Sequence, residues 1–318
     1  MLNNENQQAI EALKEVAMAG IKEQRSSRRW RIFFKILSLL VFLLFIMAIV
    51  GAIGSKSGRL TTAQSYTAVV DIQGVIMQGA EASADKIIPS LQEAFEDPKA
   101  KGVMLRCNSP GGSPVQSAYV YDEIMRLRQL HADKKVVAVA SDLCASGGYF
   151  IISAAEEIYA NKSSLVGSIG VRMQGFGFVE AMRKLGVENR ELTAGENKAI
   201  SDPFSPRKPE HEAFVKKMLA TTHKHFIESV KAGRGDRLAD DSDIFSGLIW
   251  TGEDAKELGL IDGFGSPATI AREVINAETM INFSPRKDVF SKLSKQISTT
   301  AENLILQINQ APKPVLHQ

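Results

Sequence analysis

Strand-like and helical runs alternate through the first part of the main domain, and this alternation constrains the fold more than any other feature. The strand-like runs are residues 67–77, 101–108 and 134–141, and the segments with helical spacing between them are residues 84–97 and 115–130. Such alternation predicts crossover units, a parallel sheet and helices on both of its faces. We therefore expect an α/β fold with its functional residues at the carboxyl ends of the strands.

An apolar run near the start predicts a membrane anchor. Residues 36–53 carry no charge and lie between Lys35 and Lys56, and about 18 such residues are enough to span a bilayer as a helix. A cleaved signal peptide, processed near residues 52–54, is the alternative. We favour an uncleaved transmembrane helix over residues 32–55, because the basic segment is long and the apolar core exceeds the usual length of about 7 to 15 residues.

The distribution of basic residues predicts the orientation and the domain boundaries. Basic side chains crowd the amino-terminal side of the run, at Arg25, Arg28, Arg29, Arg31 and Lys35, against Lys56 and Arg59 on the other side. The positive-inside rule then keeps the N-terminus cytoplasmic and the main domain outside the cytoplasm. The expected parts are a cytoplasmic segment (1–31), the transmembrane helix (32–55), a polar linker (56–66), the main domain (67–275) and a C-terminal helical tail (276–318).

Composition excludes several classes of partner. The formal net charge is +2 over 318 residues, and there is no extended Lys/Arg face interleaved with aromatics, so we expect no nucleic-acid partner. The two cysteines, Cys107 and Cys144, are too few for a disulfide scaffold and lack the spacing of a zinc site. We expect no metal and no cofactor. Free buried thiols are favoured over a single bridge between the two cysteines.

The first unusual strand end is residues 108–113, "NSPGGS". Gly111 and Gly112 let the backbone turn tightly and expose adjacent N–H groups, and the following helix directs its positive end the same way. This is a suitable cradle for an anion or oxyanion. An ordinary turn would use the same residues.

The second unusual strand end is residues 145–148, "ASGG". A serine at the start of a helix is commonly an N-cap, and Ser146 alone would be interpreted that way. The small residues around it, however, leave room for another chain to approach its hydroxyl. Ser146 is thus a candidate nucleophile, which would need a base.

Histidine is the usual base, but the five histidines lie in surface-like contexts: His131, His211, His223, His225 and His317. We interpret each as solvated. Lys198 lies in a loop rich in Gly, Pro, Ser and Asp, residues 193–206. A lysine serves as a base when burial lowers its pKa from about 10.4 toward neutrality. The alternative is an ordinary solvated lysine.

Three motifs together resemble one known family. "NSPGG", "ASGGY" followed by "SLVGSIGV", and "GENKAISDPFSP" occur in an order and spacing similar to the signal peptide peptidase A family of membrane-anchored Ser/Lys proteases. The resemblance covers residues 67–267 and matches the short, single-repeat form, since no second copy of the motifs is present. It implies a ClpP/crotonase-type fold of repeated β-β-α units.

The resemblance implies a role for each matching residue. Ser146 corresponds to the nucleophile, Lys198 to the general base and Ser168 to a serine that orients the lysine. Gly111 and Gly112 fall where a backbone N–H holds the oxyanion. The loop continues with Ser113 where relatives often have a third glycine, which leaves open which amide points inward.

The resemblance also implies partners, substrate and location. It implies a homo-oligomer with active sites at subunit contacts, anchored in the cytoplasmic membrane with its catalytic domain on the periplasmic or extracytoplasmic side. The implied substrates are cleaved signal peptides and other short apolar peptides. A neutral lysine base also requires that Glu196 and Asp202 point away from Lys198.

Three other functions differ in class. A ClpP-type Ser/His/Asp peptidase would share the fold but needs a loop histidine. A crotonase-like enzyme acting on acyl-CoA would be separated from its substrate by an outward-facing anchor. A non-catalytic membrane scaffold would tolerate the loss of both Ser146 and Lys198.

Overall fold

A computed structural model of the chain describes residues 14, 18, 28–45 and 65–285. The chain divides into two units, Met1–Thr62 and Ala63–Gln318. In the first unit, residues 28–45 are helical and exposed. None of the helices within the described ranges is long and apolar enough to cross a membrane. The rest of the predicted anchor, residues 46–55, lies outside those ranges.

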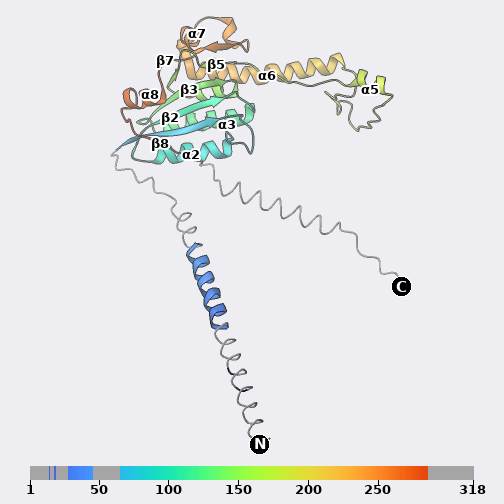
Figure 1. Ribbon diagram of the computed structural model, residues 1–318. Helices are drawn as coiled ribbons and strands as arrows, with labels where there is room; N and C mark the ends of the chain where they lie inside the picture. Colours follow the sequence, from blue (N-terminus) through green and yellow to red (C-terminus); the bar gives the residue numbers. More distant parts are fainter. Residues whose placement is uncertain (1–13, 15–17, 19–27, 46–64, 286–318) are drawn as a thin grey trace, which may run out of the picture. The chain divides into compact units, whose positions relative to one another are not determined.

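The second unit contains an eight-stranded, mostly parallel sheet (Figure 1). Its main path has the order β6-β5-β3-β2-β1-β8, and β4 and β7 branch from β3. Among the strand pairs that the structure describes, only β5 and β6 are antiparallel. The strands are β1 (Tyr66–Gln73), β2 (Ala100–Ser109), β3 (Lys135–Ala145), β4 (Glu157–Ala160), β5 (Leu165–Gly167), β6 (Ile249–Thr251), β7 (Gly263–Phe264) and β8 (Met280–Asn282).

The helices join these strands as the sequence pattern predicts. The α-helices are α2 (Ala84–Glu96), α3 (Pro114–Leu130), α4 (Gly147–Ile152), α5 (Val179–Leu185), α6 (Pro209–Arg234), α7 (Gly252–Glu257) and α8 (Pro267–Glu273), with short 3-10 turns at Gly235–Arg237 and Ser242–Phe245. The expected α/β fold with a parallel sheet is confirmed.

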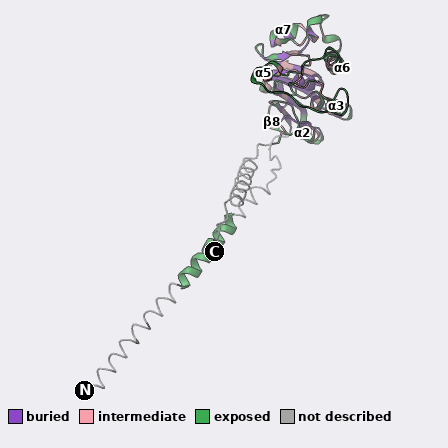
Figure 2. Ribbon diagram, turned by 90° about the vertical axis from the view of Figure 1, so that its right-hand side faces the viewer, coloured by how far each residue is buried: buried purple, intermediate pink, exposed green. Residues whose placement is uncertain are grey.

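Because side chains alternate between the two faces of each strand, the sheet contributes to two hydrophobic cores. Successive side chains of a strand point to opposite faces. Val103 and Leu105 of β2 therefore join the large core beneath α2, α3 and α4, whereas Met104 joins a smaller one beneath α8. Figure 2 shows the buried residues concentrated in this sheet body. Helices thus cover both faces.

The sheet extends past the predicted domain boundary at residue 275. Strand β8 pairs in parallel with β1, with Ala68 opposite Ile281. The expectation of a helical tail from residue 276 is therefore wrong for residues 276–285, because a three-residue strand is too short to show a period in the sequence. The remaining tail, including the predicted helix over residues 289–310, lies outside the described ranges.

The two cysteines form a disulfide, which corrects the expectation of free thiols. Cys107 of β2 and Cys144 of β3 are bridged, with their Cα atoms 5.6 Å apart. A register shift after Cys107 places Ser109 opposite Cys144 and brings the two sulfurs together. This shift between adjacent strands is not visible in a sequence where the cysteines are 37 residues apart.

Helix α6 forms a projecting arm together with the segment before it. Its buried residues, Phe226, Val230 and Arg234, all lie near its carboxyl end, where it packs on the large core. The rest of α6 leaves the sheet body, and α5 with its flanking loops lies at the far end (Figure 1). We call residues 171–225 the arm. Most of its side chains are exposed.

Candidate active site

The split pairing of β3 determines where Ser146 lies. The first half of β3 pairs with β4 and its last residues pair with β5, so that Ala145 lies opposite Gly167. Ser146 and Ser168 directly follow these two residues. Two parallel strands therefore end side by side, each with a serine at its carboxyl end, which is where active sites of α/β folds gather.

Ser146 has a strained backbone and an uncommitted hydroxyl. Its φ of 52° and ψ of −123° are rare for a residue other than glycine. Its N–H donates to the Gly167 carbonyl at 2.8 Å, which holds this geometry. Ser146 occupies the N-cap position of α4 but makes no side-chain capping bond. The N-cap interpretation is therefore wrong, and in the part of the chain that the structure describes the hydroxyl makes no hydrogen bond.

The glycines around Ser146 permit close packing. A Cβ on Gly111 would lie 2.7 Å from the Ser146 Cβ, and one on Gly147 would lie 2.5 Å from the Ser117 Oγ. Real Cβ atoms do not approach so closely, so the loop after β2 and the start of α4 require glycine. Gly148 instead faces the interior, where a Cβ would lie 3.2 Å from the Cys107 Sγ.

Tyr149 anchors α4, the helix that begins directly after Ser146. It is fully buried, and its hydroxyl donates to the Leu260 carbonyl at 2.7 Å. Burial raises the pKa of the Tyr149 hydroxyl well above its ordinary value, so this donor stays protonated. Helix α4, and with it Ser146, is fixed to the interior of the domain.

The loop after β2 presents one free amide beside Ser146. The Gly111 N–H donates to the Ser109 Oγ at 3.1 Å. The Gly112 N–H, in contrast, finds no acceptor within the described ranges. A Cβ built on Gly147 would lie only 3.3 Å from the Gly112 nitrogen. Between the two predicted glycines, the available donor near Ser146 is therefore Gly112.

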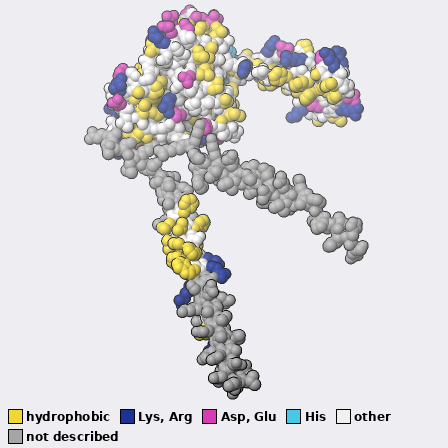
Figure 3. Space-filling model, viewed as in Figure 1, with side chains coloured by type: hydrophobic (Ala, Val, Ile, Leu, Met, Phe, Trp, Pro, Cys, Tyr) yellow, Lys and Arg dark blue, Asp and Glu magenta, His cyan; other side chains and the backbone are white. Residues whose placement is uncertain are grey.

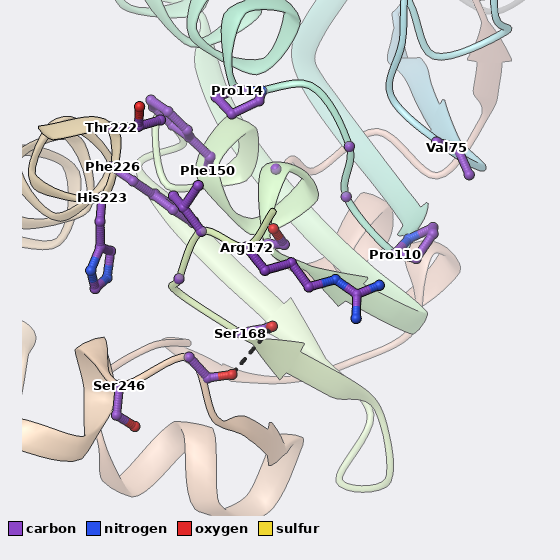
Figure 4. Close-up of a pocket in the computed structure, with 17 residues that line it drawn as sticks. Val75, Pro110, Pro114, Phe150, Ser168, Arg172, Thr222, His223, Phe226 and Ser246 are labelled. Atoms are coloured by element: carbon purple, nitrogen blue, oxygen red, sulfur yellow. Dashed lines mark hydrogen bonds between the residues drawn. The ribbon is translucent and has the colours of Figure 1, made fainter. Parts of the chain in front are cut away.

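These groups share a pocket of about 850 Å³ (Figure 4). Its walls include Ser146, Ser168, Gly111 and Gly112 together with two stacked aromatic rings, Phe150 and Phe226, whose centroids are 4.8 Å apart. Four of the five predicted site residues thus come together. The pocket is open and partly apolar, and it has the size of a typical ligand site.

Ser168 repeats the backbone geometry of Ser146. Its φ is 50°, and its N–H donates to the Leu248 carbonyl at 2.7 Å. The Ser168 Oγ makes a long bond of 3.4 Å to the Gly247 carbonyl, drawn as the dashed line in Figure 4. The hydroxyl is therefore weakly held and has capacity for a further partner.

Lys198 does not join this pocket. It is an exposed residue of the arm, between α5 and α6, and within the described ranges no hydrogen bond or ion pair joins it to Ser146 or Ser168. The Asp202 carboxylate accepts hydrogen bonds from the Asn189 Nδ2 at 3.2 Å and the Phe204 N–H at 3.1 Å. Neither Asp202 nor Glu196 makes an ion pair with Lys198 in the described part of the chain.

His223 lies in the pocket, although its sequence context indicated a solvated side chain. It comes from α6, is half-buried, and its Nε2 lies 3.0 Å from the Ile169 carbonyl. The signal in the sequence is the spacing of His223, Phe226 and Val230, which shares one helical face with two buried residues. Trp250 and Phe264 do not line this pocket.

A family model and several relatives indicate a peptidase family. A model described as "Peptidase family S49" matches residues 128–279. The chain is similar to "Putative protease MJ0651" of Methanocaldococcus jannaschii, with 36% identity over 55% of this chain and 56% of that protein. It is also similar to "Putative signal peptide peptidase SppA" of Enterococcus faecium, with 28% identity over 62% of this chain and 59% of that protein.

A third relative carries the name of a transport protein and not of a peptidase. The "Na(+)/H(+) antiporter NhaA" of Brucella melitensis is 43% identical over 68% of this chain. The chain spans only 30% of that protein's length. The transport named there is a property of the longer protein and is not assigned to the shared segment.

Proposed function

We propose that the protein is a serine endopeptidase of peptidase family S49, whose model matches residues 128–279, with Ser146 as nucleophile and Lys198 as general base. The observation that carries this proposal is the strained Ser146, whose free hydroxyl lies in an open pocket beside the unpaired Gly112 amide. A nucleophile next to a preorganised N–H donor is the arrangement that acyl transfer requires.

The proposed hydrolysis has two steps, acylation of Ser146 and hydrolysis of the acyl-enzyme. The Ser146 Oγ attacks the peptide carbonyl carbon while its proton passes to the Lys198 Nζ, and the oxyanion accepts a hydrogen bond from the Gly112 N–H group. The C–N bond then breaks and Lys198 returns the proton to the leaving amine. Water hydrolyses the acyl-enzyme by the same route. Ser168 orients the lysine through its weakly held hydroxyl.

Lys198 would reach the serine of a neighbouring copy. An exposed ammonium is a poor base, and burial at a subunit contact favours the neutral amine that a base requires. The arm supports such a contact because it carries many exposed apolar side chains: Met173 (58% exposed), Phe176 (71%), Leu185 (78%), Val187 (54%) and Leu192 (98%). Figure 3 shows hydrophobic and charged side chains mixed along it. Apolar exposure on this scale marks interaction surfaces.

The location and the substrate complete the proposal. The apolar run of residues 36–53 would anchor the chain with its N-terminus in the cytoplasm, leaving the peptidase domain, a ClpP/crotonase-type superhelix of β-β-α repeats, on the periplasmic or extracytoplasmic side. The Cys107–Cys144 disulfide supports an oxidising compartment. The substrates would be cleaved signal peptides and other short apolar peptides, for which Phe150 and Phe226 offer an apolar wall.

The test is hydrolysis of a fluorogenic apolar peptide by the full-length protein in detergent. Ser146→Ala and Lys198→Ala should each reduce activity to background. The matched controls Ser163→Ala and Lys162→Ala change exposed residues of the turn between β4 and β5 and should keep full activity. Activity in Ser146→Ala would reject the nucleophile, and an inactive but correctly assembled parent would favour the non-catalytic scaffold.

The position of His223 makes it the competing base. The Nε2 of its imidazole is already bonded to the Ile169 carbonyl. We therefore expect His223→Ala to reduce kcat/KM by less than about tenfold, whereas the loss of a general base reduces it by about 100-fold or more. A larger loss in His223→Ala than in Lys198→Ala would instead indicate a Ser/His peptidase.

A further inference from the structure

The Ser146 pocket contains a cation that the proposed chemistry does not use. Arg172 lines the pocket four residues after Ser168. In Figure 4 its side chain extends toward the loop at Pro110 and away from Phe226 and His223. The guanidinium therefore lies along the side of the pocket opposite the aromatic wall.

No negative charge balances Arg172 in this pocket. The wall residues are Val75, Pro110, Gly111, Gly112, Pro114, Ser146, Gly147, Phe150, Ser168, Gly170, Val171, Arg172, Thr222, His223, Phe226, Ser246 and Gly247, and none of them is Asp or Glu. Within the described ranges Arg172 makes no ion pair and no side-chain hydrogen bond. Arg172 is exposed, so its guanidinium is accessible to a ligand that enters the pocket, whereas the buried Arg234 is already paired with Asp262.

An unpaired guanidinium presents five donors in a planar fork that matches a carboxylate. From these observations we infer that Arg172 binds a carboxylate of the peptide substrate. An extended peptide advances about 3.4 Å per residue, so a carboxylate in this pocket belongs to one of the few residues beside the scissile bond. It is either the free C-terminus of a short peptide or an acidic side chain.

This inference rests on the proposed function and adds a substrate preference to it. Peptides released by an earlier cleavage end in a free carboxylate, whereas an uncut protein presents an amide bond at the same point. Arg172 would therefore let the enzyme select short products over intact chains. Such charge-assisted, bidentate contacts are stronger than neutral hydrogen bonds.

The experiment compares matched peptides with the full-length protein in detergent. One fluorogenic apolar peptide is made as the free acid and as the C-terminal amide, and a second amidated pair carries Asp or Asn next to the scissile bond. The parent should favour the acid over the amide, or Asp over Asn, by about tenfold in kcat/KM and mainly through KM. The preference should shrink as salt is added. The pair that shows it identifies the source of the carboxylate.

Variants assign the preference to the guanidinium. Arg172→Gln should bring the ratio within each pair close to one, and Arg172→Lys should keep only part of it, because an ammonium lacks the fork. Arg272→Gln, an exposed arginine on α8 outside the pocket, should leave the ratios as in the parent. Equal rates for both members of both pairs in the parent, or a preference that survives Arg172→Gln, would overturn the inference.

A binding measurement separates this inference from the proposed function. Fluorescence anisotropy of labelled acid and amide peptides on full-length Ser146→Ala reports affinity without hydrolysis. A carboxylate preference in binding, together with an inactive parent, would leave the inference standing and reject the peptidase. Peptide hydrolysis without any such preference would support the peptidase and overturn the inference about Arg172.

Discussion

Gly112 combines two properties that no other residue type offers at its position. Its φ is 155°, and a Cβ there would lie 2.0 Å from the Ile76 carbonyl oxygen. In the parallel bridge at this point, the Gly111 carbonyl and the Ser113 N–H form hydrogen bonds with Ile76, and the Gly112 N–H makes no bond to it. The free amide beside Ser146 is thus a consequence of glycine at this point.

We expect Gly112→Ala to reduce kcat/KM by about 100-fold or more, the cost of losing one oxyanion donor, because the loop must shift and the amide shifts with it. The control is Gly79→Ala, where φ is 80° but no atom lies within 4 Å of the added Cβ. That change should cost about 1 kcal/mol of stability and leave kcat/KM unchanged. Steady-state kinetics and thermal unfolding of both variants provide the check, and a normal kcat/KM in Gly112→Ala would contradict the assignment.

Arg234 and Asp262 form the most deeply placed ion pair in the described ranges. The Arg234 side chain is fully buried, with Nη1 2.7 Å from the Asp262 Oδ2 and Nε 3.0 Å from the Gly259 carbonyl. Burial alone would raise the pKa of Asp262, but hydrogen bonds from Arg234 and the Ile158 N–H outweigh it, and the pKa lies below its ordinary value of 3.8. The carboxylate is therefore charged when the protein is folded.

Asp262→Asn should lower the free energy of unfolding by about 3 kcal/mol, because it leaves a buried guanidinium without its counter-charge. The pKa of Asp262 is depressed on folding, so its contribution is complete above pH 3.8 and is lost as the pH falls through the lower folded value. Urea unfolding at pH 7 and at pH 3 should show the parent and variant converging at the lower pH. A constant difference would contradict this assignment.

Sequence reasoning identified the residues whose neighbours are distinctive and missed those defined by packing. Ser146, Ser168 and Gly112 are in short motifs with small residues, and all three line the pocket. His223 and Arg172 also line it, but each belongs to a segment that looks like ordinary polar surface. Only the packing of α6 and the path of the chain after β5 bring them to Ser146.

At the level of elements, the strand–helix alternation predicted the parallel sheet because each crossover leaves a local signature. It did not predict β5, β6 and β8, which are three residues long and take their structure from partners distant in sequence. The antiparallel edge and the register shift at Cys107 also depend on long-range pairing. For the same reason the disulfide was not predicted.

The disulfide joins the two strands that carry the functional loops. Replacing both Cys107 and Cys144 by serine should cost about 3 to 4 kcal/mol of stability, the range for a loop of 37 residues. Adding a reductant during unfolding should bring the parent to the stability of the double variant and should not affect that variant further. Thermal unfolding measures all four conditions. Equal stability of parent and variant without reductant would contradict a bridge in the folded protein.

At the scale of the whole molecule, the two residues of the proposed dyad lie in different parts of the fold. Ser146 is fixed in the sheet body by its N–H bond to Gly167 and by the anchoring of α4, whereas Lys198 is on the projecting arm. No sequence pattern shows that an arm leaves the domain, since amphipathic helices that pack on a neighbouring subunit resemble those that pack on their own core. The motifs predicted the dyad, the structure places Lys198 outside the Ser146 pocket, and we propose that the two residues meet between neighbouring copies.

Subunit complementation tests this separation. Ser146→Ala and Lys198→Ala should each be inactive alone, but a mixture dissociated and reassembled at equal amounts should recover activity. With a repeated head-to-tail contact, about one quarter of the sites would combine an intact serine with an intact lysine from its neighbour. Fluorogenic peptide hydrolysis before and after reassembly gives the fraction, and size measurement confirms that mixed assemblies have formed. If Lys198 instead served the serine of its own chain, every site in the mixture would lack one member of the dyad, and correctly assembled mixtures would stay inactive.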